Sequence, residues 1–244
     1  MGLSPSTLFH FTSKKGLKGI LSDNFRIKYC LEEIDHTEEP VEIAIPMVSF
    51  CDIKISEIKD HIEKYGYYGI GLSKDWAFEK GLNPVLYLNT KSEFPNKLIS
   101  TIRKNREKLD TIDYLRLSEF VRYAKKYEGK LSRNGKTINN YRFADEREWR
   151  YVPEINSVPE SFENWLRKDK YNTSEKKKLA NDKLKNERLL FNANQILYIV
   201  VKTESEINDI IKLIRNVKGM NYTMEEIDRL NTRILSYERI FNDF

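Results

Sequence analysis

The sequence predicts an α+β fold, in which strands come early in the chain, helices are inserted after them, and strands return late. Apolar runs typical of strands occur before residue 90 and return after residue 140. Between them, over residues 94–127, apolar residues recur at helical spacing. The sequence contains no internal repeat and no low-complexity segment.

The first part of the chain alternates strands with short helices. Residues 8–12 (LFHFT) predict a strand, and residues 13–21 predict a helix that Ser13 can cap. Pro46 indicates that the strand over residues 41–50 is an edge strand or a bulged one. Further strands are predicted at residues 25–29, 67–72 and 84–88, a short helix at 56–64, and a helical turn at 74–81.

The rest of the chain contains the inserted helices and the returning strands. After the helix-rich residues 94–127, strands are predicted at 141–152 and 195–202, with a basic helical stretch at 161–185 between them. Two C-terminal helices each begin with a capping box, Thr203 with Glu206 and Thr223 with Glu226. We therefore expect one domain over residues 1–202, a helical insertion at 94–136 and a C-terminal helical pair at 203–244.

The composition excludes several classes of protein. The 244 residues are 40% hydrophobic and 12% aromatic, which is enough apolar surface to exclude a disordered chain. Two cysteines, Cys30 and Cys51, are too few for a disulfide-built secreted domain. No apolar run approaches the roughly 20 residues that span a bilayer, and the N-terminus lacks the features of a signal peptide. We expect a cytoplasmic protein with no membrane partner.

The net charge of +5 is a balance between unlike segments. Residues 97–136 carry a surplus of +7 and residues 161–190 a surplus of +4, so the remainder carries −6. Basic segments raise the affinity for polyanions such as nucleic acid. The simpler interpretation is that they are solvated faces of lysine-rich helices.

The segment FADEREWRY (143–151) is the most informative for chemistry. Alternation along a strand would place Glu146, Glu148 and Arg150 on one face. Two neighbouring carboxylates repel, which raises at least one pKa unless a cation intervenes. Such a pair could bind a sugar hydroxyl and stabilise an oxocarbenium-like charge, while its second member orients an acceptor. The alternative is an edge strand with a solvated, arginine-compensated face.

His10 and the tyrosine–glycine segment 65–73 (YGYYGIGLS) are two further candidate binding sites. His10 could donate a hydrogen bond to a ribose or a phosphate, or it could be a satisfied core residue. The glycines of 65–73 would let a ligand approach the backbone and the tyrosines could stack on a base, or the segment is a bulged strand packed by aromatic rings. His36 and His61 lack the spacing of metal ligands, so we expect no structural metal.

Four motifs, in chain order, carry a resemblance to a known family. IPMVSFCD (45–52), YGYYGIGLSKDW (65–76), NPVLYL (83–88) and DEREWRYVP (145–153) together resemble the AbiGi abortive-infection proteins, which are bacterial phage-resistance proteins described as antitoxins of a two-gene system. The resemblance implies a cognate toxin or antitoxin from a neighbouring gene as a partner.

The same motif order also resembles the ADP-ribosyltransferase fold, which has a mixed β-sheet core and uses NAD. This resemblance implies that Glu148 is the catalytic residue and that Glu146 is the first glutamate of an E-x-E pair that activates the acceptor. It also implies that His10 holds the NAD ribose and that one of three tyrosines stacks on nicotinamide. The implied cofactor-binding residues are His10, Phe11, Thr12, Ser49, Tyr65, Tyr67 and Tyr68.

Two hypotheses follow, from different classes of function. In the first, the protein is a phage-defence toxin that transfers ADP-ribose from NAD to a macromolecule, with nucleic acid as the expected acceptor and Lys125 and Lys126 bordering its site. In the second, it is a non-catalytic antitoxin or binding component whose basic helices meet an acidic partner surface. A nuclease is a weaker third hypothesis, because the sequence lacks a metal-binding carboxylate cluster.

Overall fold

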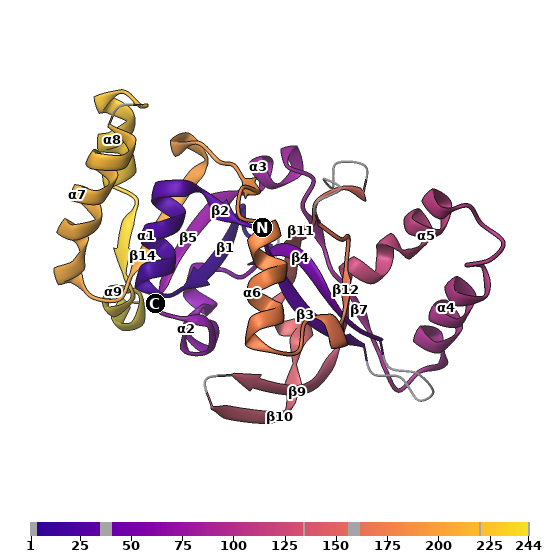
Figure 1. Ribbon diagram of the computed structural model, residues 1–244. Coiled ribbons are helices and arrows are strands. Elements are labelled where there is room, and N and C mark those ends of the chain that lie inside the picture. The colour runs from indigo at the N-terminus through magenta and orange to yellow at the C-terminus, as the bar shows by residue number, and fades with distance from the viewer. Residues whose placement is uncertain (1–3, 35–40, 134, 156–161, 220, 244) are drawn as a thin grey trace. The chain divides into compact units, whose positions relative to one another are not determined.

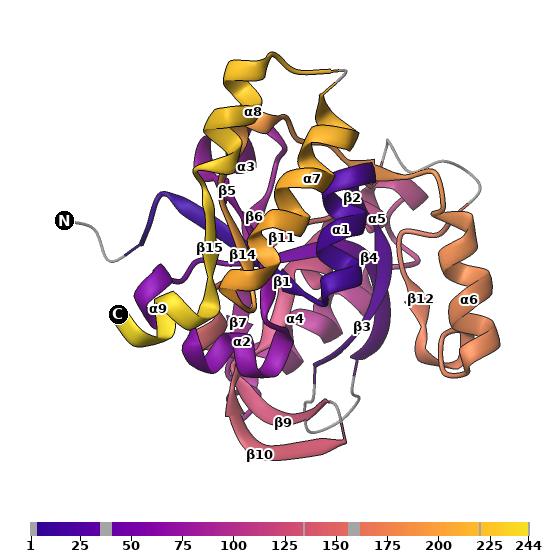
Figure 2. The same ribbon diagram turned by 90° about the vertical axis from the view of Figure 1, so that its left-hand side faces the viewer.

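A computed structural model describes residues 4–34, 41–133, 135–155, 162–219 and 221–243 (Figures 1 and 2). The chain forms two compact units, each built from separate segments. The first unit comprises Met1–Arg26, Ser49–Leu82 and Arg188–Phe244, and the second comprises Ile27–Val48 and Asn83–Glu187. Both contain strands and helices, which confirms the predicted α+β class.

The first unit is built on a mixed sheet with the strand order β15-β14-β5-β1. β1 and β14 both run antiparallel to β5, whereas β15 is parallel to β14. The predicted domain boundary at residue 202 falls inside this unit, because β15 lies beyond it and pairs with β14. The strands are β1 (Thr7–Thr12), β2 (Phe25–Arg26), the end of β4 (Val41–Cys51), β5 (Tyr68–Ser73), β13 (Arg188–Leu189), β14 (Ile196–Val201) and β15 (Ile234–Ser236).

Side chains alternate along β1 as the sequence predicts. The rings of Phe9 and Phe11 stack at 5.6 Å on one face, where α2 and α9 contribute Ile62 and Ile240 to the same core cluster. His10 points to the other face, where its ring meets that of Phe25.

The helices of the first unit begin where the sequence indicates. The Ser13 hydroxyl accepts the Gly16 N–H at the start of α1, and both predicted capping boxes, at Thr203 and Thr223, are present. Figure 2 shows α1 and α7 side by side. The helices are α1 (Lys14–Asp23), η1 (Ile55–Glu57), α2 (Lys59–Tyr65), α3 (Lys74–Glu79), η5 (Ala193–Gln195), η6 (Glu204–Glu206), α7 (Ile207–Lys218), α8 (Met224–Asn231) and α9 (Tyr237–Asp243).

In the second unit, β4 is flanked on both sides. Ala44 pairs with Leu31 of β3 and also with Leu166 of β12, so the first alternative predicted from Pro46, an edge strand, is wrong at this point. The second alternative, a bulge, is absent from the pairing with β3, whose register passes Pro46 without a shift. The flanking β12 has only two residues and gives no strand signal of its own. The strands are β3 (Lys28–Ile34), β6 (Asn83–Pro84), β7 (Leu86–Leu88), β8 (Ala124–Lys126), β9 (Glu128–Arg133), β10 (Lys136–Arg142), β11 (Glu148–Tyr151) and β12 (Leu166–Arg167).

The predicted helical insertion is helical only in its first part. After α5 the chain turns into strand, with β8 parallel to β7 and β9 forming a two-stranded sheet with β10. The helices of the second unit are α4 (Glu93–Lys104), α5 (Thr111–Tyr123), η2 (Phe143–Glu146), η4 (Lys168–Lys170) and α6 (Ser174–Lys183).

None of the helices in the described ranges has the length and apolar character needed to cross a membrane.

Candidate functional site

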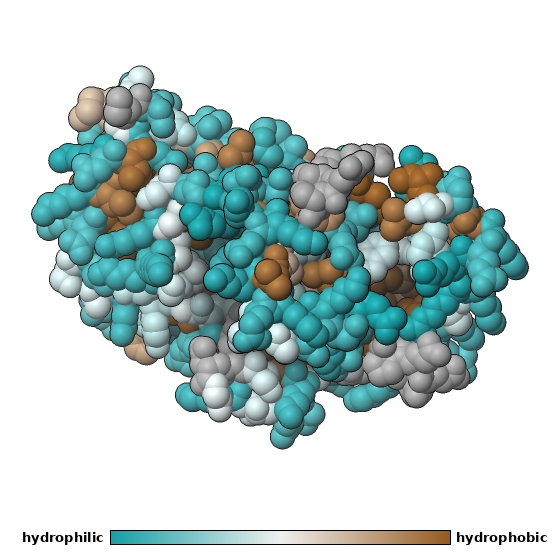
Figure 3. Space-filling model, viewed as in Figure 1, coloured by the Kyte–Doolittle hydropathy of each residue, from teal (hydrophilic) through white to brown (hydrophobic). Residues whose placement is uncertain are grey.

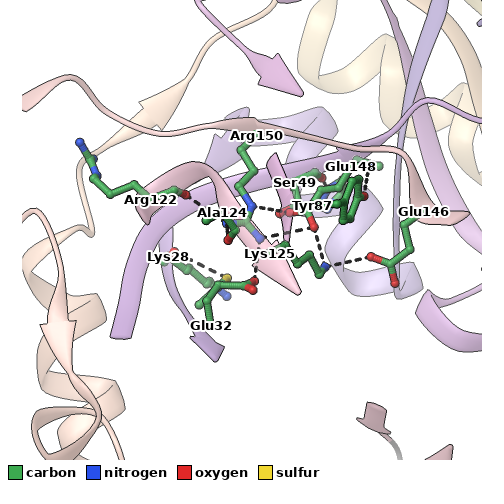
Figure 4. Close-up of polar contacts among 12 residues, drawn as sticks. Lys28, Glu32, Ser49, Tyr87, Arg122, Ala124, Lys125, Glu146, Glu148 and Arg150 are labelled. Atoms are coloured by element: carbon green, nitrogen blue, oxygen red, sulfur yellow. Dashed lines mark hydrogen bonds and ion pairs between the residues drawn. The ribbon is translucent and has the colours of Figure 1, made fainter. Parts of the chain in front are cut away.

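Both candidate catalytic glutamates belong to a buried ionic network in the second unit, centred on Lys125 of β8 (Figure 4). The Nζ of Lys125 lies 2.9 Å from Oε2 of Glu146 and 2.5 Å from Oε2 of Glu148. The side chains of the two glutamates are each 5% exposed and that of Lys125 is 11% exposed. One cation therefore bridges both carboxylates away from solvent.

Glu148 and Arg150 share one face of β11, as the alternation of the strand predicts. The Nε of Arg150 donates to Oε1 of Glu148 at 2.6 Å, and its Nη2 lies 2.9 Å from Oε1 of Glu32 on β3. The remaining nitrogen, Nη1, donates to the carbonyl of Arg122 at 3.0 Å. Figure 4 shows this fully buried guanidinium between the two carboxylates.

Glu146 reaches the network by a different route. It ends the 3₁₀ helix η2, and Arg147 then adopts a left-handed conformation with φ 45° before β11 begins. The prediction that Glu146 and Glu148 share a strand face is therefore wrong, because Glu146 does not belong to the strand. The two carboxylates converge on Lys125 from two different elements instead.

The charges in the network shift the pKa of its members in opposite directions. Burial favours the neutral form of Glu148, but the positive charges of Arg150 and Lys125 outweigh it and hold the Glu148 pKa well below its usual range. For Glu32, burial prevails and its pKa is raised despite the attraction of Arg150. Burial alone would lower the Lys125 pKa, but the surrounding carboxylates raise it. The repulsion expected between the two carboxylates is thus relieved by a cation.

Aromatic side chains enclose the network. The Tyr87 hydroxyl accepts the backbone N–H of Glu148 at 2.8 Å, and burial raises the Tyr87 pKa, which keeps the phenol neutral. Burial and the nearby Glu146 likewise raise the Tyr141 pKa. The Phe143 ring lies 5.0 Å from the Lys125 ammonium. These rings separate the charges from water and strengthen their mutual attraction.

The interpretation of Lys125 and Lys126 as an acceptor-facing basic surface is wrong. Both residues are buried, and the Nζ of Lys126 lies 3.2 Å from the carboxylate of Glu33. The acidic partners of both lysines lie outside residues 97–136. A charge count restricted to this segment therefore omits the carboxylates that pair with them. Part of the surplus of residues 97–136 is therefore neutralised inside the second unit.

The residues predicted to bind NAD belong to the first unit, whereas the two glutamates belong to the second. The Nδ1 of His10 is 2.8 Å from the carbonyl oxygen of Ser49, an acceptor that places the proton on this nitrogen. The same imidazole packs against the rings of Phe25 and Phe50. His10 is therefore hydrogen-bonded to the backbone of Ser49 and packed among aromatic rings, as expected of a satisfied core histidine.

Each of the three candidate stacking tyrosines already contacts another side chain of the first unit. Tyr65 stacks on His61 with 4.3 Å between ring centroids, and Tyr67 meets Tyr237 edge-on at 5.1 Å. The Tyr68 hydroxyl donates to Glu206 at 2.9 Å.

The glycines of the tyrosine–glycine segment accommodate the protein's own chain. A Cβ atom on Gly69 would lie 2.7 Å from the Phe11 ring, and one on Gly71 would lie 2.8 Å from the Phe9 ring. Gly66 has φ +122°, and a Cβ there would collide with the carbonyl oxygen of Thr12. The packing interpretation of this segment explains its glycines.

The arrangement does not fit NAD as the resemblance implies. The imidazole that would hold the ribose is bonded to a backbone carbonyl, and the glycine positions are filled by Phe9 and Phe11. Both oxygens of Glu148 already accept hydrogen bonds from cations. Within the described ranges, no three His, Cys, Asp or Glu side chains are grouped so that they could hold a metal ion.

Sequence reasoning missed Glu32 and Tyr87, which complete the network. Glu32 stands in the segment KYCLEEI, where an acidic residue on a half-exposed strand carries no particular signal. Tyr87 lies within the predicted strand at residues 84–88, in which a tyrosine is common. Glu32 takes its role from the distant Arg150, and Tyr87 takes its role from the distant backbone N–H of Glu148.

Comparison with known proteins places the chain in a family. The sequence model of the family described as abortive phage resistance protein AbiGi, antitoxin, matches residues 23–202. A relative from Lactococcus lactis subsp. cremoris, named abortive phage resistance protein AbiGi, is 29% identical over 221 residues, which cover 82% of this chain and 89% of the relative. No solved structure matches, so the ADP-ribosyltransferase-like form of the sheet stays a prediction. The chain belongs to the AbiGi family of abortive phage resistance proteins.

Proposed function

We propose that this protein is the non-catalytic antitoxin of a two-component phage-resistance system, and that it acts by binding a cognate toxin. The proposal rests on the antitoxin description of the family and on one structural observation. That observation is the buried network, in which Glu146 and Glu148, the candidates for catalysis, are committed to ion pairs with Lys125.

A catalytic carboxylate must direct an oxygen at the reacting atoms. In Glu148, Oε1 accepts from Arg150 and Oε2 accepts from Lys125. To release either oxygen, the protein would have to break a buried ion pair, leaving Lys125 with Glu146 alone or Arg150 with Glu32 alone in a site that is closed to water. The network is therefore better suited to holding β3, β8 and β11 together than to turning over a substrate.

A binding role also agrees with where the exposed charge lies. Within the basic segment 97–136, Lys104, Arg106 and Lys108 are exposed, whereas Lys125 and Lys126 are buried. Lys104 ends α4, and Arg106 and Lys108 follow it. An acidic surface on the partner would complement them and would speed the encounter of the two proteins.

The test is co-expression with the product of the neighbouring gene. We expect the neighbouring protein to arrest growth when it is expressed alone, and this chain to restore growth and to co-purify with it. A Glu175→Gln variant, altered at an exposed site of α6 outside the basic segment 97–136, should restore growth equally well. If this chain is toxic by itself and Glu148→Ala removes the toxicity, the antitoxin proposal is wrong.

NAD-dependent transfer to nucleic acid, the first hypothesis from the sequence, stays a prediction. Its test is incubation with labelled NAD and RNA, DNA or cell lysate. Transfer by the wild-type protein that is lost in Glu148→Gln would favour the transferase over the antitoxin, provided that the variant remains folded.

A further inference from the structure

We infer that the apolar groove between α4 and α5 is where the toxin docks, and that its occupant is an amphipathic helix of the toxin with acidic residues at one end. This inference rests on the proposed antitoxin function and adds the surface and the chemistry of the contact. The groove lies wholly within the second unit.

The groove has an apolar floor and space for large side chains. Figure 3 shows apolar side chains gathered over α4 and α5 and beside a hollow next to these helices. The cavity volume of the groove is about 120 Å³, below the roughly 300–1,000 Å³ of pockets that hold a drug-sized ligand, so the groove suits an inserted side chain better than a whole small molecule. Ile99 and Ile102 of α4 form buried parts of the lining, and Tyr114 and Val121 of α5 are half-buried. Ile43 and Trp165 complete the apolar part.

Positive charge gathers at one part of this groove. Arg103 itself lines it, and the Arg106 guanidinium lies 5.9 Å from the ring of Tyr114, another lining residue. Lys104 and Lys108 are exposed in the same stretch and form no ion pair with any residue in the described ranges. An occupant that buries apolar side chains on the floor would gain further affinity from carboxylates placed near these cations.

A helix suits this surface better than the other classes of occupant do. Two neighbouring helices present rows of side chains between which a third helix can insert its own, with apolar anchors at i, i+3, i+4 and i+7. Nucleic acid requires cations along its whole path, whereas here they flank an isoleucine-rich floor.

The first experiment measures the affinity of full-length variants for the neighbouring gene product. We expect Arg103→Glu combined with Arg106→Glu to weaken binding at least about tenfold, with a smaller dependence on salt. Tyr114→Ala should also weaken binding, because it removes part of the lining. The matched control is Lys130→Glu with Lys136→Glu, which makes the same change of charge on exposed residues of β9 and β10 and should bind as the wild type does. Equal thermal melting of all variants shows that they are folded.

The second experiment identifies the occupant. A photoreactive benzoylphenylalanine placed at position 114 should crosslink to one segment of the toxin, with apolar residues at helical spacing and Asp or Glu at one end. A crosslink to nucleic acid, or to a toxin segment without this pattern, overturns the inference.

The outcomes separate the inference from the function on which it rests. If the wild type binds and neutralises the neighbouring protein, and the Arg103/Arg106 variant does so equally well, only the docking surface is wrong. If the wild type neither binds nor neutralises it, the antitoxin proposal is wrong and the docking surface falls with it.

Discussion

The Nε of Arg150 donates to Oε1 of Glu148, two residues earlier on the same face of β11, at 2.6 Å. The same guanidinium reaches Glu32 on β3 and the backbone carbonyl of Arg122 at the end of α5. A single buried arginine thus ties together three elements that are far apart in the sequence. Its position makes the network a determinant of the stability of the second unit.

Replacing Glu148 by glutamine should destabilise the protein. The amide keeps the shape of the side chain but leaves Lys125 and Arg150 with one negative charge fewer in a buried site. We expect a loss of about 3–5 kcal/mol in the free energy of unfolding, measured by urea denaturation. Glu107→Gln, at an exposed position, should change it little. Equal stability of the two variants would show that the network contributes nothing.

Lys125 and Glu148 should be energetically coupled. Lys125→Met leaves Glu146 and Glu148 buried without their shared cation, and we expect it to be as destabilising as Glu148→Gln. In the double variant the loss should be smaller than the sum of the two single losses, because each single substitution already breaks the Lys125–Glu148 ion pair and the second cannot break it again. A double-mutant cycle measures this coupling, and strict additivity would contradict it.

The network should give stability two opposite dependences on pH. The Glu148 pKa is lowered from its ordinary 4.5, so its contribution is present above about pH 4.5 and is lost as the pH falls further. The Glu32 pKa is raised from the same value, so its contribution is complete below about pH 4.5 and is lost as the pH rises through its folded pKa. Glu32→Gln should therefore lose less stability than the wild type between about pH 4.5 and pH 7. Urea denaturation at several pH values in this range measures the free energy of unfolding of both proteins. The same change of that free energy with pH in the two proteins would contradict the prediction.

Substitution of Gly71 on β5 should show whether a glycine is required there by the packing of the Phe9 ring. Gly71→Ala places a methyl group 2.8 Å from the Phe9 ring and should cost about 1–3 kcal/mol. Gly19→Ala is the matched control, because its Cβ meets nothing within 4 Å in α1, and it should stabilise by about 0.5–1 kcal/mol. Both effects are measured by chemical denaturation. If Gly71→Ala is neutral, the close packing of Phe9 against β5 is not what requires a glycine at this position.

Local patterns in the sequence predicted local structure. The N-cap at Ser13, the capping boxes at Thr203 and Thr223, and the alternation of Phe9, His10 and Phe11 depend on neighbours within a few residues, and all of them are present. The shared face of Glu148 and Arg150 is of the same kind.

The remaining features depend on distant partners or on rare backbone conformations. From the local sequence, Lys125 is predicted to be a cation on a basic helix. Its position in a buried strand is explained only by Glu146 and Glu148, which lie more than twenty residues later in the chain. Arg147 takes a left-handed conformation without the glycine or asparagine that would signal it, so the turn that removes Glu146 from β11 could not be predicted. The candidate carboxylates could be predicted, but their neutralisation could not.

The order in which the ribosome makes the chain acts differently on the two units. Every residue of the second unit has been synthesised once Glu187 is joined, whereas the sheet of the first unit still lacks β14 and β15. Until β14 has been made, one edge of β5 is unpaired, and such an edge promotes aggregation of nascent chains. We expect stalled nascent chains that end before Ile196 to be cleaved by protease in residues 1–26, and chains that extend well past Ser236 to be protected there. The sheet of the first unit is therefore complete only after its last strand, β15, has been made.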